Sequence, residues 1–217
     1  MTAQQSLKTA LQERVSPVAR ENGFKGSAPN WRRVTTLGDW AIVNIQSSSW
    51  NTPERGRCVV NISVAPEPWL RWQAARLPRG LPKAISESLG LYRDRLHPRG
   101  TPPGVDGWWE IIDSTSAQAA ADDIVGQLSR AGWATLDRLL NRSEMLAQVR
   151  AGSLGFMKRE HFLVFFAMAE ALLLMDDGPS QALEDQLALA RGHVTPVQKD
   201  NAAHFETWVR AQSNRPR

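Results

Sequence analysis

The sequence predicts an α+β fold: an antiparallel meander sheet of four to five strands, packed by an N-terminal helix and by C-terminal helices. Two observations lead to this fold class. Short β-like runs, separated by tight turns, follow one amphipathic segment, and neighbouring runs are close enough to pair as antiparallel strands. After residue 113 the apolar residues recur at helical spacing instead.

The first element is a predicted helix over residues 2–22. Leu7, Leu11 and Val15 recur at helical spacing and would form its buried stripe. Gly23 follows as a natural C-terminal stop, because glycine adopts the left-handed conformation that ends many helices. This helix is expected to pack on the sheet.

Five strands are predicted, and a proline-rich stretch separates the third from the fourth. Residues 66–106 contain seven of the 13 prolines, so most of this stretch cannot form one long element. We expect it to wrap the sheet edge and to include a short helix near residues 83–88. The predicted strands cover residues 31–37, 40–47, 57–65, 89–96 and 107–112.

The rest of the chain is predicted to be helical. The caps at Ser114–Ser116 begin a helix that Gly132 is expected to end. Later helices are expected near residues 143–152, 157–175, 179–191 and 196–212, the last two with first-turn prolines. Residues 1–151 are therefore interpreted as an α+β domain, and residues 152–217 as a C-terminal helical extension packed on the same domain.

Composition excludes several classes of protein. A single cysteine, Cys58, leaves no internal disulfide framework and no four-cysteine zinc site. The most apolar run, residues 162–175, is shorter than the ~20 residues that a membrane span needs. The N-terminal 20 residues have no apolar core of the kind that signal peptides contain. We therefore expect a cytoplasmic protein.

No motif of catalysis or of metal binding is present in the sequence. The four histidines form neither an HxH nor an HExxH pair, and Asp200 with His204 supplies only two potential ligands. A GxSxG nucleophile elbow and a glycine-rich phosphate loop are also missing from the sequence. We expect no metal site and no cofactor, and the interpretation leans away from an enzyme.

The most informative pattern is a set of amides on alternate strand positions. Because side chains alternate between the two faces of a sheet, strands 40–47 and 57–65 each have one wholly apolar face. The opposite face carries Asn44, Gln46, Asn61 and Ser63, bordered by Trp40. Asparagine is unfavourable in strands, and amides both donate and accept hydrogen bonds. This polar face is the candidate surface for binding a ligand or partner; a solvated outer face is the alternative interpretation.

Three residues from the later strands complete this candidate set. Trp108 and Trp109 are adjacent, so one ring is expected in the core and the other on the amide face or under a helix. Arg93 and Arg95 lie on the predicted strand 89–96. With Glu110, the two arginines would also be the polar groups of an enzyme pocket between the sheet and the proline-rich stretch.

A second candidate surface mixes aromatic and basic residues. Residues 67–99 carry a net charge of +4, equal to that of the whole chain. Indoles can stack on bases and arginines can contact phosphates. This segment is the basis of the nucleic-acid alternative; packing of the indoles at the sheet edge would be the structural interpretation. The residues concerned are Trp69, Arg71, Trp72, Arg76 and Arg79.

The order of several short motifs carries a family resemblance. These are Gly23-Phe24-Lys25, Trp31-Arg32-Arg33, Asn44-Ile45-Gln46-Ser47 with Trp50, Val60-Asn61-Ile62, the arginine-rich Tyr92–Leu96 and Trp108-Trp109-Glu110. In this order and spacing they resemble a bacterial family catalogued as domain of unknown function 4304, over roughly residues 5–145. The resemblance implies an α+β fold and carries no established activity.

Three functional hypotheses follow. The first is a non-enzymatic cytosolic protein that binds a protein partner through the polar sheet face. By analogy alone, small α+β proteins of this kind often act as inhibitors or as immunity partners of bacterial toxins. The alternatives are a nucleic-acid-binding accessory protein that uses residues 69–99, and an enzyme with a pocket between the sheet and the proline-rich stretch.

Overall fold

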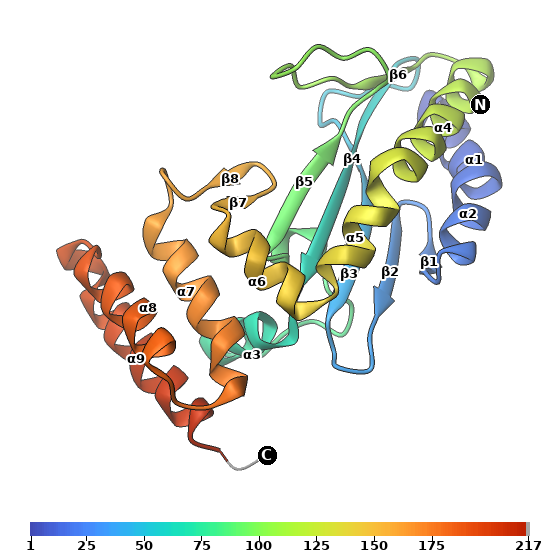
Figure 1. Ribbon diagram of the computed structural model, residues 1–217. Helices are drawn as coiled ribbons and strands as arrows, with labels where there is room; N and C mark the ends of the chain where they lie inside the picture. Colours follow the sequence, from blue (N-terminus) through green and yellow to red (C-terminus); the bar gives the residue numbers. More distant parts are fainter. Residues whose placement is uncertain (216–217) are drawn as a thin grey trace.

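The computed structural model of the protein describes residues 1–215, and its centre is a six-stranded antiparallel sheet (Figure 1). The strand order is β1-β2-β3-β4-β5, and β6 also pairs with β4. The α+β class and the meander order are therefore confirmed. The strands are β1 (Lys25–Ser27), β2 (Asn30–Val34), β3 (Trp40–Ser47), β4 (Gly56–Ala65), β5 (Tyr92–Leu96) and β6 (Trp109–Ile111).

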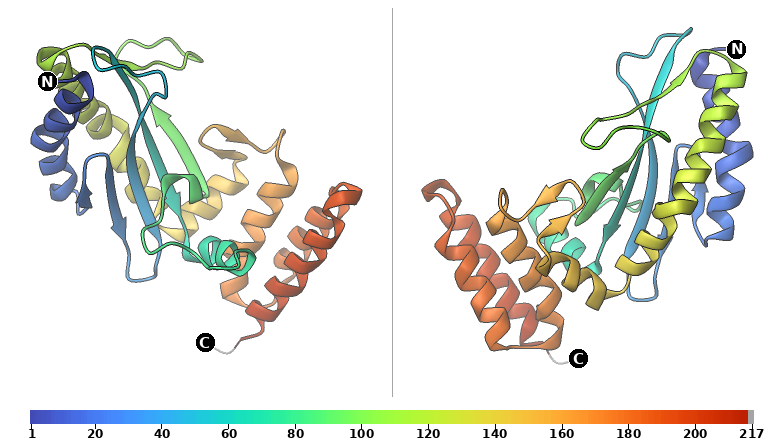
Figure 2. Two further views of the ribbon diagram at one scale, coloured as in Figure 1. Left: turned by 180° about the vertical axis from the view of Figure 1, so that it is seen from behind. Right: turned by 45° about the horizontal axis from the view of Figure 1, so that its top comes forward.

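A layer of helices covers one face of this sheet (Figures 1 and 2). The apolar strand positions, such as Val43 and Val60, pack there in one hydrophobic core with Leu7 and Ile124 from the helices. Burying these side chains supplies the main driving force for the layer. It consists of α1 (Ala3–Ala10), the π-helical turn Leu11–Val15, α2 (Ser16–Glu21), α4 (Ser114–Gln127), the π-helical turn Leu128–Gly132 and α5 (Trp133–Leu139).

Gly132 does not end a helix, contrary to the sequence prediction. The chain stays helical from α4 through the π turn into α5. A Cβ atom at Gly132 would lie 2.9 Å from Leu128 Cδ2 and 3.3 Å from Leu96 Cδ1. The glycine is therefore needed because the helix approaches its neighbours closely.

The C-terminal part of the chain stacks beyond β5 (Figure 1). Residues 157–162, predicted as helix, instead belong to a small hairpin and its exit, and the main chain of β5 meets this hairpin where Phe156 N donates to Arg93 O (3.2 Å). The same hydrophobic core continues here through Leu172 and Val209. The division at residue 151 stays a prediction. The elements are α6 (Arg142–Arg150), β7 (Ser153–Leu154), β8 (Met157–Lys158), α7 (Leu163–Leu174), α8 (Gln181–Gly192) and α9 (Lys199–Ser213), with 3₁₀ turns at Met175–Asp177 and Pro196–Gln198.

The proline-rich stretch begins with a helix that is not among the elements predicted from the sequence. Its first part is α3 (Glu67–Arg76), which has Pro68 in its first turn. The short helix expected near residues 83–88 is a 3₁₀ turn at Glu87–Leu89. Residues 77–91, here called the wrap, cross the sheet face that the helix layer leaves uncovered (Figure 2, left). Within the part of the chain that the structure describes, no helix has the length and apolar character of a bilayer span.

The buried thiol of Cys58 gives a first testable expectation. Cys58 on β4 is fully enclosed, and burial raises its pKa from 9.0 to about 12. The native protein should therefore not react with the thiol reagent DTNB at pH 8, whereas the urea-unfolded protein should react at once. Fast stoichiometric labelling of the native state would contradict this placement.

The same shift predicts loss of stability in alkali. Between pH 9 and 12 the unfolded thiol ionises while the folded thiol keeps its proton, so the free energy of unfolding falls as the pH rises. Urea unfolding at pH 8 and pH 10.5 measures this fall, and Cys58→Ala should reduce it. Part should remain in that variant, because burial also raises the pKa of Tyr92.

Candidate functional site: the open face of the sheet

A row of side chains runs across four strands on the face opposite the helix layer. The strand register places Asn30 opposite Asn44, Asn44 opposite Asn61, and Asn61 opposite Arg95. Cross-strand neighbours of this kind lie close enough for their side chains to interact. The polar face predicted from strand parity is therefore a continuous polar line.

Hydrogen bonds connect this row from one end to the other. Asn44 Nδ2 donates to Asn30 Oδ1 (2.9 Å), and Asn61 Nδ2 donates to Asn44 Oδ1 (3.2 Å) and to Gln46 Oε1 (3.0 Å). Arg95 Nε donates to Asn61 Oδ1 at 3.2 Å. The amides bond to one another and not to the main chain, so they hold each other in fixed orientations and keep spare donors.

Arg95 attaches a loop to the end of this row. Its Nη1 donates to both carboxylate oxygens of Asp106, at 2.8 and 2.9 Å. The hydrogen bond from Arg95 holds the pKa of Asp106 below its usual range. The Arg95 guanidinium also lies 5.9 Å from the ring centroid of Trp108. Arg95 thus carries no unbalanced charge, which makes this face polar but not strongly basic.

The two adjacent tryptophans point to opposite sides, as predicted. Trp109 is buried, and its Nε1 donates to Asp123 of α4 at 2.8 Å. Trp108 is half-buried on the other side, beside Arg95. One indole therefore belongs to the helix layer and the other to the polar face.

Part of the predicted polar face is covered, which corrects the sequence interpretation. Ser63 is fully buried, and a Cβ at Gly90 in the wrap would lie 2.4 Å from its Oγ. Arg93 Nη2 pairs with Glu87 at 3.3 Å, beneath the wrap. Trp40 is half-buried against the core. Ser63 is therefore enclosed, whereas Trp40 is half-buried and Arg93 keeps 32% of its side-chain surface but is held in an ion pair.

The other half of the face stays accessible, and we call it the open face. Gln46 is exposed, Asn44 is half-buried, and Arg95 keeps 32% of its side-chain surface. Asn61 is 7% exposed and forms the centre of the hydrogen-bonded row. The open face is defined by Asn44, Gln46, Asn61, Arg95 and Trp108.

The sequence reading did not single out Trp50 as a site residue, although it belongs to the family motif. Trp50 lies in the loop between β3 and β4, four residues after Gln46, and 90% of its surface is exposed. A fully exposed indole has no packing role in the isolated chain. Indoles are frequent hot spots of protein interfaces, so Trp50 is added to the rim of the candidate site.

The structure does not bring the residues of the nucleic-acid alternative together on one surface. Trp69 is 9% exposed and Trp72 is fully buried, both against the C-terminal helices. Arg71 Nη2 is paired with Asp176 (2.6 Å) and Glu67 (3.2 Å). Only Arg76 and Arg79 are exposed. The indoles therefore cannot stack on bases without unfolding of this region.

The three polar groups of the enzyme alternative do not line one common cavity of the described chain. Arg93 is beneath the wrap, whereas Glu110 pairs with Arg55 and Arg57 at the end of the sheet, and hydrogen bonds from them lower its pKa. Of the three, only Arg95 is among the residues that line a cavity of about 570 Å³ between β5 and the loop that contains Pro102. Residues 1–215 hold no group of three or more potential metal ligands.

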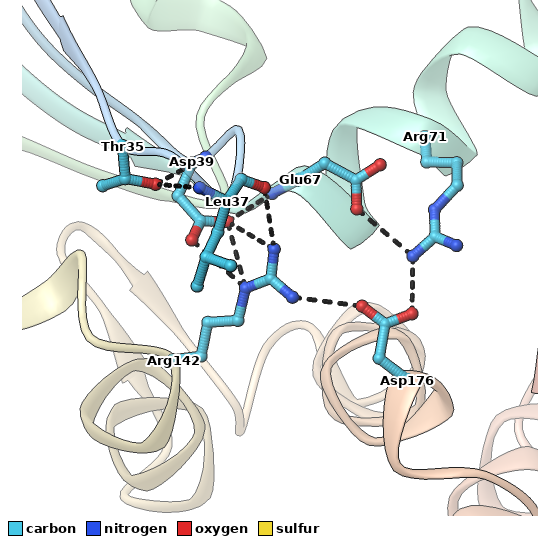
Figure 3. A network of polar contacts seen from close by, with 7 residues as sticks. All are labelled: Thr35, Leu37, Asp39, Glu67, Arg71, Arg142 and Asp176. Atoms are coloured by element: carbon cyan, nitrogen blue, oxygen red, sulfur yellow. Dashed lines mark hydrogen bonds and ion pairs between the residues drawn. The ribbon is translucent and has the colours of Figure 1, made fainter. Parts of the chain in front are cut away.

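An ion-pair network that no sequence motif indicated connects distant parts of the chain (Figure 3). Asp39, almost fully buried in the β2–β3 turn, accepts hydrogen bonds from Arg142 at 3.1–3.2 Å and from the main-chain N of Glu67 at 2.7 Å. Arg142 Nη1 reaches Asp176 at 3.1 Å, and Asp176 also binds Arg71. The network joins the sheet to α3, α6 and the end of α7.

The charges in this network shift one another's protonation. Burial alone would lower the pKa of the Arg142 guanidinium, but its hydrogen bond to Asp39 and the nearby carboxylates raise it overall. Burial raises the pKa of Glu67, and Arg71 offsets this only in part. Every carboxylate here faces an arginine, so the network is interpreted as a structural clamp.

The fold and this site define an α+β protein whose sheet exposes a hydrogen-bonded amide row on one half-covered face. The family described as "Domain of unknown function (DUF4304)" matches residues 15–138, more than half of the chain, and the chain belongs to this family. All residues of the open face, and Trp50, fall within the matched segment. No curated protein and no solved structure matches the chain.

Proposed function

We propose that this chain is a non-enzymatic binding protein that holds a protein partner on the open face, with Trp50 at its rim. The observation that carries the proposal is the amide row Asn44–Asn61–Arg95, which is fixed by side-chain hydrogen bonds on an accessible face. A pre-oriented polar surface loses little conformational entropy on binding.

The chemistry of the face favours a protein over a nucleic acid. Arg95, the cation of the row, is paired with Asp106, so little unbalanced charge remains for phosphates. Gln46 Nε2 has no partner within residues 1–215 and can donate to the carbonyl groups of a partner. In one form of this proposal, the chain is an inhibitor or an immunity-type protein that binds a bacterial toxin. A cytoplasmic location is part of it and is supported by the single reduced cysteine.

Two substitutions on the face test the proposal. Trp50→Ala removes the exposed indole, and Gln46→Arg places a charge beside the amide row. For a partner isolated with the unaltered protein and then purified, each variant should weaken binding roughly thirtyfold, the effect of losing a hot-spot contact. Titration calorimetry measures the affinity.

Val197→Arg is the matched control, because Val197 is 94% exposed and lies in the 3₁₀ turn between α8 and α9. It should bind like the unaltered protein. A partner that binds all four proteins equally would place its interface elsewhere. If nuclease treatment abolished the capture of the partner, the result would instead favour the nucleic-acid alternative.

A further inference from the structure

A cavity of about 710 Å³ lies where α3 meets the start of α7 and the connection between α8 and α9. Aromatic and apolar side chains line much of it, among them Trp69 and Trp72 from α3 with Phe165 and Met168 from α7. Trp69 and Phe165 meet edge to face, with ring centroids 5.2 Å apart. Ligand sites for small molecules typically have volumes of ~300–1,000 Å³ and mostly apolar walls.

The rim of this cavity carries an arginine that has no carboxylate partner among the described residues. Arg76 is exposed, and its guanidinium lies 5.7 Å from the ring centroid of Trp72. In the described part of the chain, no carboxylate lies within ion-pair distance of Arg76. Glu160, the acid that lines the cavity, is 3.3 Å from His161 and largely exposed. An arginine stays charged at every physiological pH, so Arg76 can pair with an anion at the rim.

We propose that this cavity binds a small organic anion with a flat apolar body. The body would lie against the half-buried Phe165 and Met168, and the acidic group would meet Arg76 at the rim. Three of the residues that suggested a nucleic-acid surface, Trp69, Trp72 and Arg76, thus line this cavity. This proposal is independent of the open face, which lies on the sheet.

Two fluorescent probes of the same shape test the charge requirement. One is 8-anilinonaphthalene-1-sulfonate, and the other is N-phenyl-1-naphthylamine, which lacks the sulfonate. The sulfonate should bind at one saturable site. Arg76→Gln should weaken it about tenfold, the loss of one charge-assisted contact, and leave the amine unchanged. Arg79→Gln, three residues away and not in the cavity wall, is the control and should change neither probe.

A second variant tests the location. Ala202 lines the cavity from α9, so Ala202→Trp should fill it and abolish the binding of both probes. Thermal melting of each variant shows whether it is folded. If Ala202→Trp does not fold, Arg76→Gln still tests the proposal, because Arg76 is exposed. Equal sulfonate binding by the unaltered protein and Arg76→Gln would overturn the proposal. So would a dimer in sedimentation that Ala202→Trp makes monomeric, because a second copy would then occupy the cavity.

Discussion

Arg142→Met should lower the free energy of unfolding by about 3 kcal/mol or more, the cost of leaving a buried carboxylate without its counter-ion. The side chain of Asp39 is 2% exposed, and three of its hydrogen bonds come from Arg142. Without the guanidinium, Asp39 keeps the main-chain N–H of Glu67. Urea unfolding followed by circular dichroism measures the change.

The double variant Asp39→Asn with Arg142→Met separates the buried charge from the lost packing. The neutral amide at position 39 needs no counter-ion. We therefore expect the free energy of unfolding of the double variant to be roughly 1–2 kcal/mol higher than that of Arg142→Met alone. Arg130→Met is the matched control, since Arg130 is exposed and only its hydrogen bond to Gln127 is lost. It should change stability by less than about 0.5 kcal/mol. An Arg142→Met protein as stable as this control would show that the network is not a clamp.

Trp72→Ala should lower the free energy of unfolding by about 3–5 kcal/mol, the range found when a buried aromatic side chain is deleted. The indole is fully buried, and it packs against Phe205 (centroids 5.0 Å apart) and Trp208 (5.2 Å). These contacts join α3 to α9, so the loss should be concentrated in the C-terminal helices. Hydrogen exchange of the α9 amides should accelerate more than that of β4.

Trp50→Ala is the matched control for this substitution. It deletes the same side chain at a site that is 90% exposed, so we expect a change within about 0.5 kcal/mol. Trp72→Phe keeps part of the aromatic packing, so its free energy of unfolding should lie between those of Trp72→Ala and Trp50→Ala. If Trp72→Ala and Trp50→Ala were equally stable, α9 would not depend on the indole for its position.

The strands, and the face of the sheet on which each of their residues lies, could be predicted well, because both depend on the local alternation of apolar and polar residues. Strand β3 has the predicted bounds, and Asn44 lies beside Asn61 on the polar face. The opposite directions of Trp108 and Trp109 also follow from alternation. Gly132 misled the prediction, because a helix-ending glycine and a glycine needed for close packing look alike in a sequence.

Accessibility could not be predicted in the same way. Ser63 and Gln46 both lie on the polar face, yet Ser63 is covered by Gly90 of the wrap, whereas Gln46 is exposed. Trp72 is fully buried because it meets α9, whereas Trp50 meets no other aromatic ring in the part of the chain that the structure describes and is 90% exposed. The neighbours of Trp72 in the chain indicated packing, but they did not show that α9 is the element against which it packs.

The order of the amino acids is enough to predict the α+β class, the meander and the side of the sheet on which each amide lies, because backbone geometry links these properties to neighbouring residues. The folded chain was needed to show which part of the polar face stays open, that Trp69 and Trp72 line a cavity, and that Asp39 meets Arg142. Each of these depends on segments that are distant in the chain, and burial and ion pairing are properties of the assembled fold.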